Sequence, residues 1–129
     1  MPHRVDPVFL DLIHAAGRDR LKISIFDAQG RLLWYSPEWA EHTGPAATQA
    51  EALGVRWLDF VHPEDAPAAR AWILSPIDGL AVWFRAHSAN AADLWLEVAM
   101  VKRRAGAYWV ATGDNRIAPV PSCVIYQAP

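Results

Sequence analysis

Three side chains that can do chemistry lie within four positions in the stretch WLDFVHPED, residues 57–65. His62, Glu64 and Asp65 supply an imidazole and two carboxylates, the groups that bind metal ions or transfer protons. A metal site also needs ligands from other elements, and no second His or Cys cluster completes one around His62. The H-x-E spacing of zinc deaminases is present without its P-C-x-x-C partner. The residue types permit metal or acid–base chemistry, but the rest of the sequence does not support it.

The same residues also have a structural interpretation. A residue before proline is disfavoured in the α region, so a preceding helix must end near His62 because Pro63 follows. Asp65 is predicted to be the N-cap of a second helix, with its carboxylate accepting from the Ala68 N–H and Pro67 in the first turn. We interpret the motif as a helix break and restart, and we assign no catalytic residue and no metal ligand.

Composition indicates one compact domain. The chain has 129 residues, 53% apolar content, 20% charge and a formal net charge of -2. Cys123 is the single cysteine, which predicts no disulfide and a reducing, cytoplasmic setting. No run of 18 apolar residues occurs, and the only basic cluster is KRR at 102–104. We therefore expect neither a membrane nor a nucleic acid as partner.

The order of predicted elements is two strands, several short helices and three strands. A hairpin is predicted from LKISIFD and RLLWYS around the turn DAQG, and helices from residues 37–53, 56–61 and 66–75. Three strands follow in GLAVWFRAH, DLWLEVAMVKR and AYWVATGDNR. An amphipathic helix precedes them within residues 1–20, the domain proper covers residues 21–117, and residues 118–129 are predicted to be a C-terminal tail.

Several short motifs fit this order. They are the D-x-x-G turn of Asp27 and Gly30, Gly44 at the end of the first short helix, the H-P-x-D element, and Arg85 followed ten residues later by Trp95. Together with the three late strands they resemble a PAS domain of the bacterial sensory type. The resemblance implies an α+β fold, with a five-stranded antiparallel sheet in spatial order 2-1-5-4-3 and short helices enclosing a pocket on one face. The sequence departs from the pattern in two places. The segment ANAAD replaces the usual Asp-Gly turn between the third and fourth predicted strands, and Ser36 replaces an asparagine at the end of the second.

PAS domains bind haem, flavin, a chromophore or small metabolites, or bind nothing. No cysteine lies in an N-C-R-F-L-Q-like helix, so a covalent flavin is not expected, and Cys123 is interpreted as a tail thiol. The candidate haem ligands are His42, expected near a helix end facing water, and His62, expected in the helix break. The cofactor is left unassigned.

Alternation along the strands, matched to the resemblance, predicts which side chains face the helices. The candidate ligand-binding residues are Ser24, Phe26, Trp57, Phe60, Trp72, Phe84, Leu96, Val98, Tyr108 and Thr112. Such a pocket suits a small apolar or aromatic ligand. The alternative is that these bulky groups fill the core completely.

The opposite sheet face is predicted to carry three indoles side by side. An apolar patch of that size requires cover, and the N-terminal helix offers an apolar stripe. The predicted interface comprises Phe9, Leu12, Ile13, Trp83, Trp95 and Trp109. A homodimer through this face is one prediction, and intramolecular cover by the helix is the alternative.

Two functions are compatible with these features. In the first, the chain is a non-catalytic sensory or dimerisation module of a signal-transduction protein, coupled to an effector domain such as a kinase or cyclase. In the second, it is a small curved-sheet α+β enzyme of the isomerase or dehydratase type. The enzyme requires an acid–base pair in the pocket, and the predicted inward positions contain no Asp, Glu or His. The sequence favours the sensory module.

Overall fold

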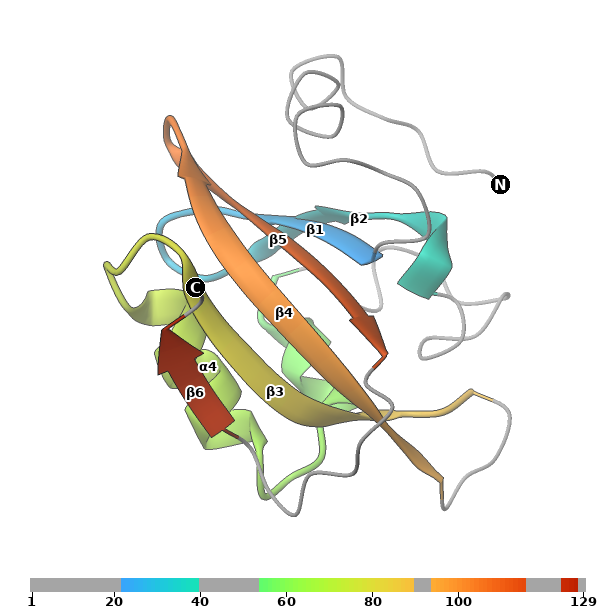
Figure 1. Cartoon of the computed structure of the whole chain (residues 1–129). Helices are drawn as coiled ribbons and strands as arrows, with labels where there is room; N and C mark the ends of the chain where they lie inside the picture. Colours follow the sequence, from blue (N-terminus) through green and yellow to red (C-terminus); the bar gives the residue numbers. More distant parts are fainter. Residues whose placement is uncertain (1–21, 40–53, 90–93, 116–123, 128–129) are drawn as a thin grey trace.

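A single antiparallel sheet forms the body of the protein, in a computed structural model that describes residues 22–39, 54–89, 94–115 and 124–127. Its strands are β1 (Lys22–Phe26), β2 (Leu32–Tyr35), β3 (Leu80–His87), β4 (Trp95–Ala105), β5 (Tyr108–Asn115) and β6 (Val124–Gln127). The described helices are η1 (Pro37–Trp39), η2 (Arg56–Phe60) and α4 (Ala66–Leu74). Figure 1 shows α4 lying against one face of the sheet, which we call the helical face; the opposite one is the outer face.

The strand order is β2-β1-β5-β4-β3-β6. The first five strands confirm the predicted order 2-1-5-4-3. The sixth strand was not expected, because residues 118–129 were predicted to be a tail. Part of that segment, Val124–Gln127, pairs antiparallel with the edge strand β3 over Leu80–Trp83.

The predicted turn between β1 and β2 is present and has a clear cause. The Asp27 carboxylate accepts hydrogen bonds from the backbone N–H groups of Gln29 and Arg31, both at 2.9 Å. Gly30 closes the turn with φ of 77°, in the left-handed region that favours glycine. A Cβ there would also approach Ile73 on α4 within 3.0 Å. The turn is therefore shaped both by its own sequence and by the helix above it.

Most of the core lies between the helical face and the helices. Trp57 from η2 and Trp72 from α4 both pack edge-on against Phe26 of β1, with ring centroids 5.2 and 6.4 Å apart. The Trp72 Nε1 donates to the Leu80 carbonyl at 2.9 Å, and the Trp57 Nε1 donates to the Gly30 carbonyl at 3.2 Å. These two buried indoles thus have hydrogen-bond partners, and they fill space that a large cofactor would need.

The face assignment of β5 was wrong. Tyr108 and Thr112 were predicted to face the helices, and Trp109 was predicted to face outward. Phe26 of β1 is directly opposite Trp109, and Ile23 is opposite Thr112. Because directly opposed residues share a face, Trp109 belongs to the helical-face core and Tyr108 packs on the outer face.

The cause of this error is the turn that joins β4 to β5. Ala105 pairs with Tyr108 across two intervening residues, so these two share a face. Met100 of β4 lies in the core, and alternation then carries Lys102 and Arg104 to the same face. Trp109 is opposite Arg104. The prediction did not allow for two inward-facing charged residues at the end of β4.

Several predictions lie outside the described residues. They concern the N-terminal helix with Phe9, Leu12 and Ile13, and the segment with His42 and Gly44. Among the residues that the structure does describe, no helix has the length and apolar character needed to cross a membrane.

Candidate functional site

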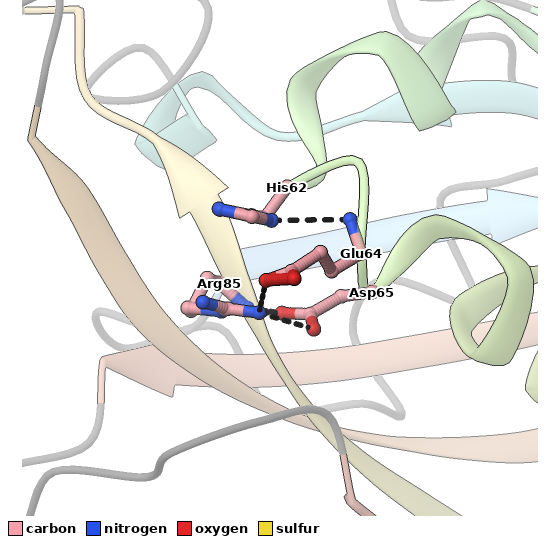
Figure 2. A network of polar contacts seen from close by, with 4 residues as sticks. All are labelled: His62, Glu64, Asp65 and Arg85. Atoms are coloured by element: carbon pink, nitrogen blue, oxygen red, sulfur yellow. Dashed lines mark hydrogen bonds and ion pairs between the residues drawn. The ribbon is translucent and has the colours of Figure 1, made fainter.

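The His62–Asp65 segment lies along the outer edge of β3, where Arg85 reaches back to it (Figure 2). Asp65 is 1% exposed, and its carboxylate accepts three hydrogen bonds from Arg85: from the backbone N–H at 2.9 Å, from Nε at 2.9 Å and from Nη2 at 2.8 Å. Glu64 adds a longer contact, 3.4 Å from Nη2. The hydrogen bonds to Asp65 raise the pKa of Arg85 above its usual range. The ion pair therefore fixes the start of α4 to the sheet.

The predicted role of Asp65 was half correct. Asp65 occupies the N-cap position, and η2 ends before Pro63, so the helix break and restart is confirmed. The predicted hydrogen bond to Ala68 is not formed, because the Asp65 backbone is itself in the α region and its carboxylate turns toward Arg85. A charged partner from β3 replaces the helix N–H groups as the donor.

His62 also holds the His62–Asp65 segment in place against β3. Its backbone N–H donates to the Arg85 carbonyl at 2.9 Å, and its Nδ1 accepts from the Glu64 N–H at 3.1 Å. Its ring lies 4.7 Å from the ring of Trp95, which also contacts His87 at 5.8 Å. Within the described ranges no group of three or more His, Cys, Asp or Glu side chains could hold a metal ion. The contacts of His62 are those of a structural residue.

A small cavity lies between the helical face and the helices. Its volume is about 40 Å³, and its lining is almost entirely apolar and aromatic: Ser24, Phe26, Leu32, Tyr35, Trp39, Trp57, Phe60, Val61, Phe84, Ala86 and Met100. Ser24 is 3% exposed, and among the described residues none forms a hydrogen bond with its hydroxyl. The cavity thus presents a buried hydroxyl in an apolar wall, with no charged side chain in the lining.

The structure brings half of the predicted ligand-binding residues together. Five of them line the cavity: Ser24, Phe26, Trp57, Phe60 and Phe84. Trp72 and Val98 are buried in the surrounding core without lining the cavity, and half-buried Leu96 lies opposite Ala86. Tyr108 and Thr112 are excluded by the face of β5 described above.

Other lining residues were not among the candidate ligand-binding residues. Ala86 and Met100 were predicted to face the helices by the same alternation as Phe84, and both line the cavity. Leu32 and Tyr35 of β2 and Val61 after η2 line the cavity through packing between distant segments. No local pattern in the sequence marks those three positions.

Lys102 is a second buried charged residue, and no pattern in the sequence singles it out. Its side chain is 0% exposed, and its Nζ donates to the carbonyls of Ile73, at 3.3 Å, and of Ser75 at the end of α4. The Nζ also lies 3.9 Å from the centre of the Trp109 ring. Burial, with a smaller effect from the nearby Arg104 charge, lowers the pKa of Lys102 to about 8. Lys102 fastens the C-terminal end of α4 to β4.

The outer face carries a smaller apolar cluster. Ile23 and Ile25 of β1, Trp34 of β2 and Val110 of β5 are buried there. Ser24 and Phe26 of the same strand line the cavity on the helical face, as predicted from alternation. Of the predicted interface residues, half-buried Trp83 and Trp95 lie on β3 and β4, opposite Ala99 and His87, whereas Trp109 belongs to the helical-face core.

Comparison with known proteins bears on this arrangement. No family model and no curated protein matches the chain. Among solved structures, the PAS domain of the Cronobacter turicensis quorum-sensing receptor RpfR in complex with C12:0 is similar, with a TM-score of 0.63 and 15% identity over 77% of this chain and 96% of that one. The same domain in complex with BDSF gives 0.60 and 16%, over the same shares of the two chains.

A third neighbour is also a PAS domain. The PAS domain of an HTR-like protein from Haloarcula marismortui has a TM-score of 0.58 and 14% identity, over 87% of this chain and all of that one. The matched regions cover 77% or 87% of this chain and 96% or all of the neighbouring chain. The order of the first five strands in the sheet agrees with the predicted order. The chain has the fold of a PAS domain.

Proposed function

We propose that the chain is a non-catalytic PAS sensory and dimerisation module of a cytoplasmic signal-transduction protein, whose cavity binds a small uncharged ligand. The cavity with the buried Ser24 hydroxyl is the observation that carries the proposal. A hydroxyl without a partner in an apolar wall costs free energy unless a bound molecule or water satisfies it. The state of the cavity would be passed to an effector domain such as a kinase or cyclase.

The lining indicates the chemistry of the ligand. No Asp, Glu, His, Lys or Arg is among the described residues that line the cavity, so a charged group inside it would have no compensating partner there. The same lack of an acid–base pair in this lining supports binding over the isomerase or dehydratase alternative. One hydrogen bond to Ser24 and contacts with the surrounding rings suit a neutral apolar or aromatic molecule. The complex of the RpfR PAS domain with the fatty acid C12:0 supports an apolar chain as a ligand for this fold, although the described residues that line this cavity offer no charged partner for a carboxylate.

The volume limits the size of the ligand. The cavity of about 40 Å³ is well below the roughly 150 Å³ that holds a benzene molecule in an apolar protein core. A ring-sized ligand therefore requires the surrounding side chains, such as Trp57 and Phe60, to move apart. The packed-core alternative predicts that they do not move and that no ligand enters.

Binding of indole, a neutral ring with one N–H donor, tests this proposal by isothermal titration calorimetry. We expect saturable binding that Ser24→Ala weakens by about three- to tenfold, the equivalent of one net hydrogen bond of about 0.5–1.5 kcal/mol. Thr112→Ala removes a comparable hydroxyl from the outer face and should leave the affinity unchanged. Native mass spectrometry of the purified chain would show a different neutral ligand retained from the cell. Absence of both kinds of ligand would leave a packed core and refute the proposal.

A homodimer through the outer face is part of the proposed function. Ile23, Ile25, Trp34 and Val110 on that face are already buried within the single chain, so the support for a dimer comes from Trp83 and Trp95, which stay partly exposed on the same face. The proposed cover is the predicted N-terminal helix and a second copy of the chain. Leu12→Asp should convert the dimer into a monomer in sedimentation velocity, while Leu12→Met should not. A wild-type monomer at all concentrations would refute the dimer.

A further inference from the structure

The side of α4 that points away from the sheet is as apolar as the side that packs on it (Figure 1). Arg70 is the only one of its nine residues with a charged side chain, and the other eight are alanine, proline, leucine, isoleucine or tryptophan. Three residues are buried, whereas Pro67, Ala71 and Leu74 are exposed and follow one another at spacings of four and three, on one side of the helix. A helix that is apolar on both sides is typically covered on both sides. The exposed side of α4 is therefore a candidate interface.

Large exposed apolar side chains gather in the same layer. Among the described residues there are four: Val55, Leu74, Ile77 and Leu94, with exposed fractions of 58%, 45%, 46% and 48%. Val55 is at the N-cap of η2, Leu74 ends α4, and Ile77 follows three residues later. Leu94 alone lies elsewhere, directly before β4. An accumulation of exposed apolar side chains marks an interaction surface more often than a bare one.

An open groove of about 620 Å³ adjoins the first turns of α4. Its apolar wall consists of Leu58, Val61, Pro63, Ala66 and Pro67. Asp59 of η2 and Arg70 of α4 complete the lining. Both are exposed, and within the described part of the chain neither forms an ion pair or a hydrogen bond. The groove thus presents one negative and one positive charge, each without a direct partner, in an apolar wall.

We propose that α4 and this groove pair with the same surface of a second copy of the chain. In a two-fold pair every contact occurs twice, from the first copy to the second and in reverse. Asp59 of each copy then meets Arg70 of the other, while the apolar walls cover each other. A surface with one charge of each sign complements itself in this way. A strongly acidic or strongly basic partner would instead place a like charge against Asp59 or Arg70.

The size of the surface sets the expected strength of the pairing. The nine residues of α4 extend over about 14 Å. A stable interface buries roughly 800 Å² on each partner, which a helix of this length and one groove do not reach easily. We therefore expect a weak pairing, with a dissociation constant on the order of 100 μM. The pairing goes beyond the proposed function, since it uses neither the outer face nor a ligand in the cavity.

Exchange of the two charges between copies tests the pairing in the full-length chain. The background is Leu12→Asp, which removes the outer-face dimer and leaves a monomer at low micromolar concentration. One chain also carries Asp59→Arg, so its groove has two positive charges, and another carries Arg70→Glu, so its groove has two negative charges. In sedimentation velocity at low salt, each alone should dimerise at least about tenfold more weakly than the background chain. Mixed together, they should form a heterodimer at least as tight as the background pair.

Matched controls separate this pairing from general charge attraction and from loss of apolar surface. A mixture of Glu38→Arg and Arg103→Glu chains carries the same charge changes at exposed positions outside the groove, and it should associate no more than the background chain. Leu74→Ser should weaken the pairing at least about tenfold. Leu94→Ser, at a leucine of similar exposure, should leave it unchanged.

Two results would overturn the proposal. One is a background chain that stays monomeric up to about 1 mM, ten times the expected dissociation constant. The other is a mixture of Asp59→Arg and Arg70→Glu chains that associates no more than the control mixture. The outer-face dimer is judged separately, by whether Leu12→Asp reduces association of the unmodified chain at low micromolar concentration, and indole binding reports the cavity. Failure of the α4 pairing is therefore distinguishable from failure of the proposed function.

Discussion

The two ends of α4 are both held to the sheet by a charged side chain, but the charges are balanced in different ways. At the N-terminal end a buried carboxylate, Asp65, pairs with Arg85 of β3, whose side chain is 21% exposed. At the C-terminal end buried Lys102 of β4 donates to the carbonyls of Ile73 and Ser75. The first end has a full opposite charge as hydrogen-bond partner, and the second has carbonyl dipoles as partners, with only a smaller attraction from the Asp78 charge.

This difference determines the protonation of the two cations. Hydrogen bonds and charge from Asp65 outweigh burial for Arg85, so the pKa of its guanidinium rises. Burial outweighs the favourable contacts of Lys102, and its pKa falls to about 8. The carbonyls at a helix C-terminus attract a cation, but they supply only a partial charge. A helix terminus alone therefore does not replace a carboxylate as partner for a buried cation.

Arg85→Ala should cause the largest loss, because it leaves the Asp65 carboxylate buried without its partner. Breaking a buried ion pair from one side costs about 3–5 kcal/mol, and the exposure of Arg85 places the expected value at the lower end. Urea denaturation measures the loss of unfolding free energy. Arg70→Ala removes an exposed arginine from α4 itself and should change stability by less than about 0.5 kcal/mol. Equal effects of the two substitutions would show that the ion pair is not important.

Asp65→Asn distinguishes the ion pair from a helix cap. Asparagine is about as good an N-cap residue as aspartate, so a capping role predicts almost no change. The structure predicts a loss of about 2 kcal/mol, because the hydrogen bonds to Arg85 lose their charge assistance. The same denaturation experiment measures it. A change below about 0.5 kcal/mol would favour the cap.

Lys102 should make stability depend on pH in the alkaline range. Its folded pKa, about 8, is below the ordinary lysine value of 10.5, so between these values the unfolded chain binds more protons and stability rises with pH. The expected rise from pH 7 to pH 10 is on the order of 2 kcal/mol. Lys102→Met should abolish this rise. Lys22→Met, at the only other lysine of the sequence, is the control and should retain the rise of stability with pH. If the rise persisted in Lys102→Met, another group would be its cause.

The fold was predictable where the cause is local. The turn residues Asp27 and Gly30 and the proline after His62 each fix the backbone within a few positions, and the structure contains the predicted turn and helix break. The strand order came from the resemblance of these motifs to a PAS domain. Local propensities and alternation leave several strand orders open, because they do not say which strands become neighbours.

The features that the sequence did not predict depend on contacts between residues far apart in the chain. Asp65 and Arg85 are twenty positions apart, so the chain around Asp65 cannot show that its carboxylate leaves the helix terminus. Lys102 and Arg104 read as surface residues, and only the register of β4 against β5 shows that they share a face with Trp109. One inverted face moved Tyr108, Thr112 and Trp109 together, because alternation links every residue of a strand.

The smallest effect is expected from Glu64→Gln. Glu64 contacts the same guanidinium as Asp65, but its side chain is 75% exposed and its oxygen lies 3.4 Å from Nη2. An exposed pair gains little because water and salt screen the two charges, so we expect a loss below about 0.5 kcal/mol. Measurement at low and high salt sharpens the comparison, since the Glu64 contribution should disappear with salt while that of Asp65 persists. If Glu64→Gln cost as much as Asp65→Asn, burial would not be the property that separates these neighbouring carboxylates.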